Sequence, residues 1–145
     1  MVAKSANSKK RLTKREYESL SSLRYALRRF LKFSEEAAQA VGLTPNQHQA
    51  LLAIKGYPGR EHVTNGELAE RLHIKHHSAV GLINRLEAQG LIVRNQSESD
   101  RREVYVTLTK RGAELLERLA AAHKEELRRV ASQLSTILED LEGER

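Results

Sequence analysis

The chemistry of this chain is concentrated in a polar stretch that begins at Lys75 and ends at Arg85. On a helical wheel, Ala79, Leu82, Ile83 and Leu86 fall on one side, and the outward side with its flanks offers polar groups. Asparagine can bond adenine, arginine can bond guanine, and either can contact phosphate. The stretch predicts a helix that fits a DNA major groove, although the polar face by itself equally fits a solvated helix. The candidate DNA-contacting residues are Lys75, His76, His77, Ser78, Asn84 and Arg85.

A second basic group, Arg101 and Arg102, lies in a polar segment between two β-type stretches, residues 91–96 and 103–108. This pattern predicts a β-hairpin with a long loop. Arginine at the tip fits the narrow, negative minor groove, and Asp100 can hold one guanidinium in a bidentate pair. An isolated run of charged residues is more often part of a solvated loop. A groove-sized helix followed directly by such a hairpin favours DNA binding.

Start and stop signals predict the elements that position these groups. Capping boxes begin at Thr13, Thr44 and Thr64, and Gly42 and Gly90 end the helices before them. They predict a long helix over 13–41, a helix from 45, a short helix from 65, a helix over 76–89, the hairpin, and a last helix over 109–141 that can break near 122–126. The predicted fold class is mainly α with a small β-wing, a winged helix-turn-helix.

The last helix carries a narrow apolar seam with spacings of three and four residues: Leu127, Val130, Leu134, Ile137 and Leu141. Such a seam packs against another helix. One partner is a second copy of the chain, with Leu20 and Leu23 of the first helix in the same interface. The other is the chain's own first helix. We favour the homodimer because the two flanking helices carry more apolar surface than one subunit readily covers.

The net charge and the length of the chain limit how it can be organised. The 145 residues carry a net charge of +6, and residues 1–33 hold ten Lys or Arg against two Glu. This excess predicts a polyanionic partner. We predict a disordered basic arm at 1–12, which either follows DNA or only aids solubility, and a single domain at 13–145. That domain divides into a winged helix-turn-helix at 43–112 and dimerisation helices at 13–42 and 113–145.

Several function classes are disfavoured. The chain has no cysteine, so it has no disulfide, thiolate metal site or thiol redox sensor. No apolar run approaches the roughly 20 residues of a membrane span, which favours a cytoplasmic protein with no membrane partner. No enzymatic motif is present. His73, His76 and His77 suggest a metal, but their spacing is loose; protonated His76 or His77 beside phosphate is the preferred alternative, and we predict no metal and no cofactor.

The segment from Leu43 to about Glu117 resembles the multiple antibiotic resistance regulator (MarR) family of bacterial winged-helix transcription factors. The resemblance rests on RLEAQGL at 85–91 and on a wing signature: Asp100, Arg102, Leu108, Thr109 and Gly112. Gly81 departs from the family, which usually has a side chain there that can reach DNA. A winged helix that binds only protein, or DNA without specificity or ligand response, stays an alternative.

The resemblance implies a homodimeric, ligand-responsive repressor on a pseudo-palindromic operator of double-stranded DNA. It implies that the six helix residues above, with Arg101 and Arg102, touch DNA, and that Asp100 supports the wing. It also implies a small aromatic or anionic ligand near the helix junctions, for which Tyr25, Phe30, Phe33 and His48 are candidate pocket residues. These four are more often plain core or interface residues.

Overall fold

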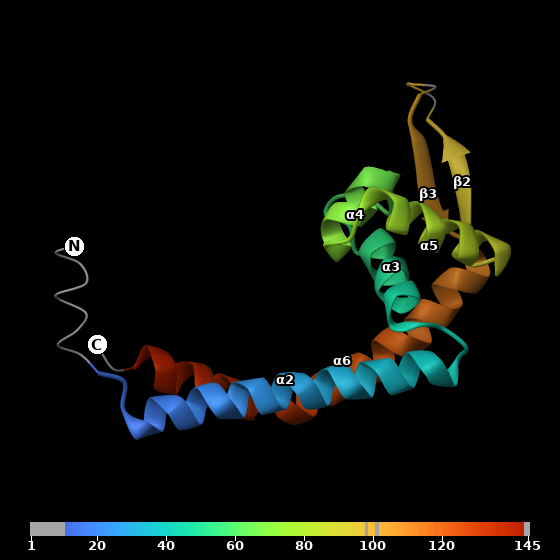
Figure 1. The fold of residues 1–145 in the computed structure, drawn as a ribbon. Coiled ribbons are helices and arrows are strands. Elements are labelled where there is room, and N and C mark those ends of the chain that lie inside the picture. The colour runs from blue at the N-terminus through green and yellow to red at the C-terminus, as the bar shows by residue number, and fades with distance from the viewer. Residues whose placement is uncertain (1–10, 98, 101, 144–145) are drawn as a thin grey trace, which may run out of the picture. The chain divides into compact units, whose positions relative to one another are not determined.

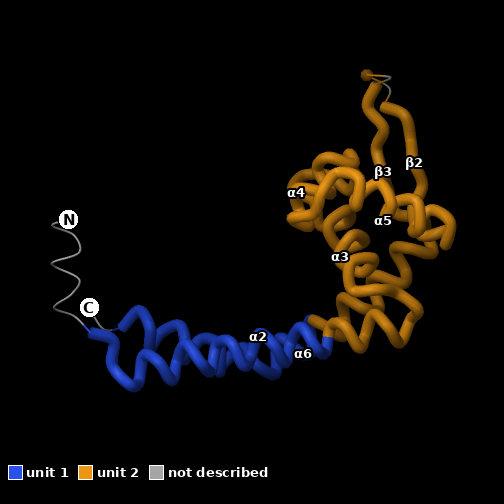
Figure 2. The backbone as a smooth tube through the Cα atoms, in the orientation of Figure 1, with its two compact units in different colours: residues 1–33, 124–145 blue, residues 34–123 orange. Residues whose placement is uncertain are grey.

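The computed structural model describes residues 11–97, 99–100 and 102–143. The chain divides into two compact units, one of residues 1–33 and 124–145 (unit 1) and one of residues 34–123 (unit 2), as coloured in Figure 2. Both boundaries fall inside helices, α2 (Lys14–Ala40) and α6 (Lys110–Glu142). The unit that holds the winged helix therefore includes the end of α2 and the start of α6, which the sequence assigned to the dimerisation helices. The predicted basic arm at 1–12 lies outside the described residues except for its last two.

Unit 2 contains the elements of a winged helix-turn-helix. These are α3 (Pro45–Lys55), β1 (His62–Val63), α4 (Asn65–Leu72), α5 (His76–Ala88), β2 (Ile92–Gln96) and β3 (Val104–Leu108), with α5 beside the hairpin of β2 and β3 in Figure 1. The mainly helical fold with its small antiparallel sheet confirms the predicted fold class.

Local sequence explains where these helices begin. Thr44 accepts a hydrogen bond from the Gln47 N–H at 3.2 Å, and the Gln47 side chain accepts from the Thr44 N–H at 2.9 Å. Thr64 and Glu67 form the same reciprocal pair at the start of α4. Each pair satisfies backbone donors that a helix start leaves without partners. All three predicted capping boxes, including the one at Thr13, are present.

The sheet has three strands in the order β1–β3–β2, with both pairings antiparallel. The sequence predicted only the β2–β3 hairpin, because the segment before α4 contains Gly56, Pro58 and Gly59 and reads as a turn. His62 and Val63, which follow that turn, pair with Thr107 and Val106. The added strand covers one edge of β3 with backbone hydrogen bonds.

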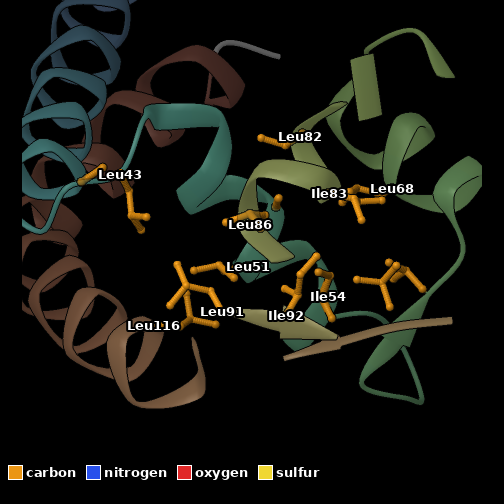
Figure 3. Packing of buried hydrophobic residues seen from close by; sticks show 14 of the residues in the cluster. Leu43, Leu51, Ile54, Leu68, Leu82, Ile83, Leu86, Leu91, Ile92 and Leu116 are labelled. Atoms are coloured by element: carbon orange, nitrogen blue, oxygen red, sulfur yellow. The ribbon is translucent and has the colours of Figure 1, made fainter. Parts of the chain in front are cut away.

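One apolar core joins the elements of unit 2. Figure 3 shows side chains from α3, α4, α5 and the wing converging, among them Leu51, Ile54, Leu68, Ile83, Leu86 and Ile92, all less than 2% exposed. Leu91 and Leu116 add the base of the wing and the start of α6 to this core. Because α5 buries its apolar side in this cluster, the opposite side of α5 must face outward.

The helix α6 runs without interruption from Lys110 to Glu142, so the predicted break near 122–126 is wrong. None of the helices in the described part of the chain has the length and apolar character needed to cross a membrane.

Candidate nucleic-acid interface

The helix α5 presents the polar face that the sequence predicted. Ala79, Leu82, Ile83 and Leu86 are buried. Lys75, His76, His77, Ser78, Asn84 and Arg85 are all exposed. Lys75 is the N-cap residue, and its side chain does not cap the first N–H groups of α5. Backbone donors and nearby positive charge make this end of α5 favourable for phosphate.

Asn84 and Arg85 are neighbours in sequence but have different surroundings. The Asn84 carbonyl oxygen accepts a hydrogen bond from the guanidinium of Arg94 on β2. Arg94 is also bonded to the Glu87 carboxylate at 2.5 Å. The three side chains link the outer part of α5 to the wing, and the sequence did not predict Arg94 as part of the site.

Arg85 has no ion-pair partner among the described residues and lies on the other flank of the helix. Its Nη1 atom is 3.5 Å from the place where a Cβ would stand on Gly81. It lines a groove of about 780 Å³ between the start of α3 and α5. The other lining residues are Thr44, Pro45, Asn46, Ile74, His77, Ser78, Gly81 and Leu82. Four of these eight residues have side chains that can hydrogen bond, which together with Arg85 suits a polyanion.

The wing carries Arg102, whose side chain is 94% exposed. Asp100 accepts the Arg102 backbone N–H at 3.0 Å, whereas the Arg102 guanidinium Nε lies 3.6 Å from the same carboxylate oxygen. Arg102 does not form the predicted bidentate pair, because Asp100 binds its backbone N–H and leaves its guanidinium extended. The predicted contact residue Arg101 lies outside the described residues.

The base of the wing is held by Thr109 and Gly112. The Thr109 hydroxyl donates to the Gly90 carbonyl at 2.7 Å and accepts the Gly112 N–H at 3.0 Å. A Cβ on Gly112 would stand 2.1 Å from the Leu91 carbonyl oxygen, closer than any real contact. The signature residues Thr109 and Gly112 therefore fix where the wing emerges relative to α5.

Two of the four candidate pocket residues line one cavity of unit 1. Tyr25 and Phe30 line a cavity of about 170 Å³ in unit 1, together with Ala26, Arg29, Glu126, Arg129, Val130 and Gln133. Phe33 is not among its lining residues. His48 is buried in unit 2, where its ring centroid lies 4.8 Å from that of His123. Burial and the neighbouring charge of His123 lower the pKa of His48.

The predicted dimer seam is partly turned inward. Ile137 is only 6% exposed and lies in the interior of unit 1, while Leu127 and Leu20 remain over 40% exposed. Leu23, Val130, Leu134 and Leu141 are half-buried. One side of the seam is thus covered within the chain, and the other side stays exposed.

Among the residues that the structure describes, no three His, Asp or Glu side chains gather as metal ligands do. His73 ends α4 in the left-handed conformation, with φ of 54°, and His76 begins the next helix.

Comparison with known proteins identifies this architecture. The MarR family model matches residues 41–103. The organic hydroperoxide resistance transcriptional regulator of Bacillus subtilis is 32% identical over 111 residues, which are 70% of this chain and 74% of that protein. The chain belongs to the MarR family. The family and the relatives are transcriptional regulators and not enzymes, which confirms both the resemblance and the prediction that the protein is not an enzyme.

Solved structures agree with this assignment. AbsC, a MarR family transcriptional regulator from Streptomyces coelicolor, matches with a TM-score of 0.66 and 25% identity over 93% of this chain and 99% of that one. A mutant of S. aureus MepR bound to an oligodeoxyribonucleotide shares the fold, with a TM-score of 0.65 and 22% identity over 86% of each chain. The protein is therefore a winged-helix transcriptional regulator, and DNA is the partner that such regulators bind.

Proposed function

We propose that this MarR family protein is a repressor that binds a pseudo-palindromic operator as a homodimer and releases it when a small ligand binds. The observation that carries the proposal is that one unit exposes both the polar face of α5 and the Arg102 side chain of the wing. A recognition helix in the major groove and an arginine in the adjacent minor groove together contact both kinds of groove. The DNA-bound MepR structure supports this use of the shared fold.

An exposed apolar stripe supports a second copy of the chain as partner. Tyr17, Leu20, Leu27 and Leu31 lie within 80° of one another on the helical wheel of α2 and are all exposed. Leu127 and Leu138 form a similar exposed pair on α6. Single exposed apolar residues are ordinary, but aligned rows of them mark an interaction surface. A dimer also places two recognition helices on successive half-sites.

The cavity of unit 1 supports a ligand of one aromatic ring with a negative charge. An apolar cavity of roughly 150 Å³ holds benzene, and this one has about 170 Å³. Tyr25 and Phe30 supply aromatic walls, and Arg29 and Arg129 supply positive charge. Arg129 is paired with Glu126 at 3.5 Å, so an entering carboxylate has to compete with that glutamate.

DNA binding is tested by the fluorescence anisotropy of labelled random-sequence duplex at several salt concentrations. The wild type should show log affinity that falls linearly with log salt, and Arg102→Ala should reduce the slope by about one. The matched control is Arg128→Ala, which removes an exposed arginine from α6 in unit 1. No binding at about 50 mM salt would overturn the proposal and leave a protein partner as the alternative.

The dimer is tested by sedimentation equilibrium of Leu31→Glu against Lys32→Glu. Leu31 belongs to the exposed stripe, whereas Lys32 lies about 100° away from Leu31 on the same helix and outside the stripe. Leu31→Glu should raise the dissociation constant at least about 100-fold, since each buried leucine contributes about 1.5–3 kcal/mol and a dimer buries two. Lys32→Glu should sediment as the wild type does. Equal behaviour of the two variants would contradict this interface.

The ligand is tested with benzoate as the probe. Saturating benzoate should weaken operator binding about 5- to 150-fold, the range of ordinary allosteric coupling. Arg129→Gln should lose this response, and Arg128→Gln should keep it. An operator affinity that benzoate leaves unchanged in the wild type would exclude this ligand class.

A further inference from the structure

The structure assigns base readout on α5 to Arg85, which lies over Gly81, and makes Asn84 a positioning residue of the wing. This inference rests on the proposed function and names the side chain that determines specificity.

Asn84 is engaged within the protein. Arginine can only donate hydrogen bonds, so the atom that faces Arg94 must be the Asn84 carbonyl oxygen. Glu87 holds the same guanidinium from the next turn of α5. An asparagine that reads adenine needs its carbonyl oxygen and amide nitrogen on the same base edge. Because Arg94 holds the oxygen toward β2, Asn84 lacks the geometry for that bidentate pair.

The surroundings of Arg85 differ from those of Asn84. It carries a full charge, lacks an ion-pair partner among the described residues, and lines the groove between α3 and α5. The guanidinium reaches back one turn along the helix to Gly81, as long helical side chains do. It thereby occupies the outward space that a side chain at position 81 would take. The two N–H groups of a guanidinium match the N7 and O6 acceptors of guanine.

This arrangement explains why position 81 is a glycine. A Cβ there would meet Arg85 Nη1 at 3.5 Å, an ordinary contact, so alanine fits. A branched side chain extends further from the helix and would displace the guanidinium. With glycine at position 81, the central DNA contact of α5 is therefore made by the end of the Arg85 side chain and not by a side chain at position 81.

The experiment is selection of bound sequences from a randomised duplex library, with the wild type and five variants, after thermal melting has shown that each variant is folded. In the wild type, one guanine per half-site should be preferred by about 5- to 150-fold, the range of a bidentate contact. Arg85→Ala and Gly81→Val should abolish that preference, and Gly81→Ala should retain it. Arg85→Lys should abolish it while keeping the salt slope, because lysine can contact phosphate but lacks the planar pair of donors.

Asn84→Asp is the decisive variant, since it keeps the acceptor for Arg94 and loses the donor that a base would need. It should leave every base preference within about twofold of the wild type. The inference is overturned if Asn84→Asp changes the preferred base, or if Arg85→Ala weakens all sequences equally. Failure of the proposed function looks different, because the wild type itself would then enrich no sequence.

Discussion

The two units of this chain bury their apolar side chains to very different extents. In unit 2, large residues such as Leu51, Ile83 and Leu86 are completely buried. In unit 1, Ile137 is the one large apolar side chain among the described residues that is buried, while eight others are at least 41% exposed: Leu12, Tyr17, Leu20, Tyr25, Leu27, Leu31, Leu127 and Leu138. The winged-helix unit obtains its core from its own elements, whereas the helical unit leaves most of its large apolar side chains exposed, as expected if a second copy covers them.

The largest expected effect tests the closed core of unit 2. Leu86→Ala should cost about 2–5 kcal/mol of unfolding free energy, because it leaves a cavity under the recognition helix. The loss, measured by urea denaturation, should be the same at every protein concentration if this core depends on one chain only. A loss that grows with concentration would remove the contrast between the units.

The next largest effect comes from the close approach of the backbone at Gly112 to that at Leu91, at the base of the wing. Gly112→Ala should destabilise the protein by about 3 kcal/mol, the upper end for overpacking, because its Cβ would meet a backbone oxygen that cannot turn aside. The control is Gly81→Ala, which should gain about 0.5–1 kcal/mol from helix propensity alone. Thermal melting of both variants measures the difference. Equal effects would contradict the packing described for Gly112.

The apolar stripe of unit 1 should behave unlike the core. Leu27→Ala should weaken the dimer by about 1.5–3 kcal/mol per subunit, with an apparent stability loss that is absent where the wild type is monomeric and grows as protein concentration rises through the wild-type dissociation constant. Melting curves over a hundredfold concentration range measure it. A loss that is constant over that range would mean that Leu27 acts within one subunit.

The smallest expected effect concerns the buried His48 and its neighbour His123. The pKa of His48 is lowered in the folded protein from its usual 6.5, mainly by burial and then by the charge of His123. The unfolded chain therefore takes up the proton first, and the stability present above pH 6.5 should decrease as pH falls below 6.5 toward the lowered value. His48→Gln should lose less melting temperature between pH 7.5 and 5.5 than the wild type.

The control for this effect is His76→Gln, which leaves His48 and His123 intact and should lose stability on acidification as the wild type does. A pH dependence that His48→Gln leaves unchanged would show that His48 does not contribute to acid sensitivity.

Much of the architecture followed from local signals. The capping residues Thr44 and Thr64, and the glycines 42 and 90 at φ of 81° and 75°, marked helix limits within a few residues. The pattern of α5 identified its buried side, because helical geometry decides which residues share a face. The strand β1 was not predicted, since two residues have no pattern of their own and pair only because β3 passes beside them.

What the sequence by itself determined are the features that act over one or two turns of chain: the helix starts and stops, the buried side of α5, the hairpin of the wing and the MarR signature. Tertiary structure alone decided that Arg94 engages Asn84, that Arg85 lies over Gly81 in the groove beside α3, and that Ile137 is buried while Leu27 is exposed. The physical reason is that a hydrogen bond or a buried contact depends on which distant side chains the fold brings within reach.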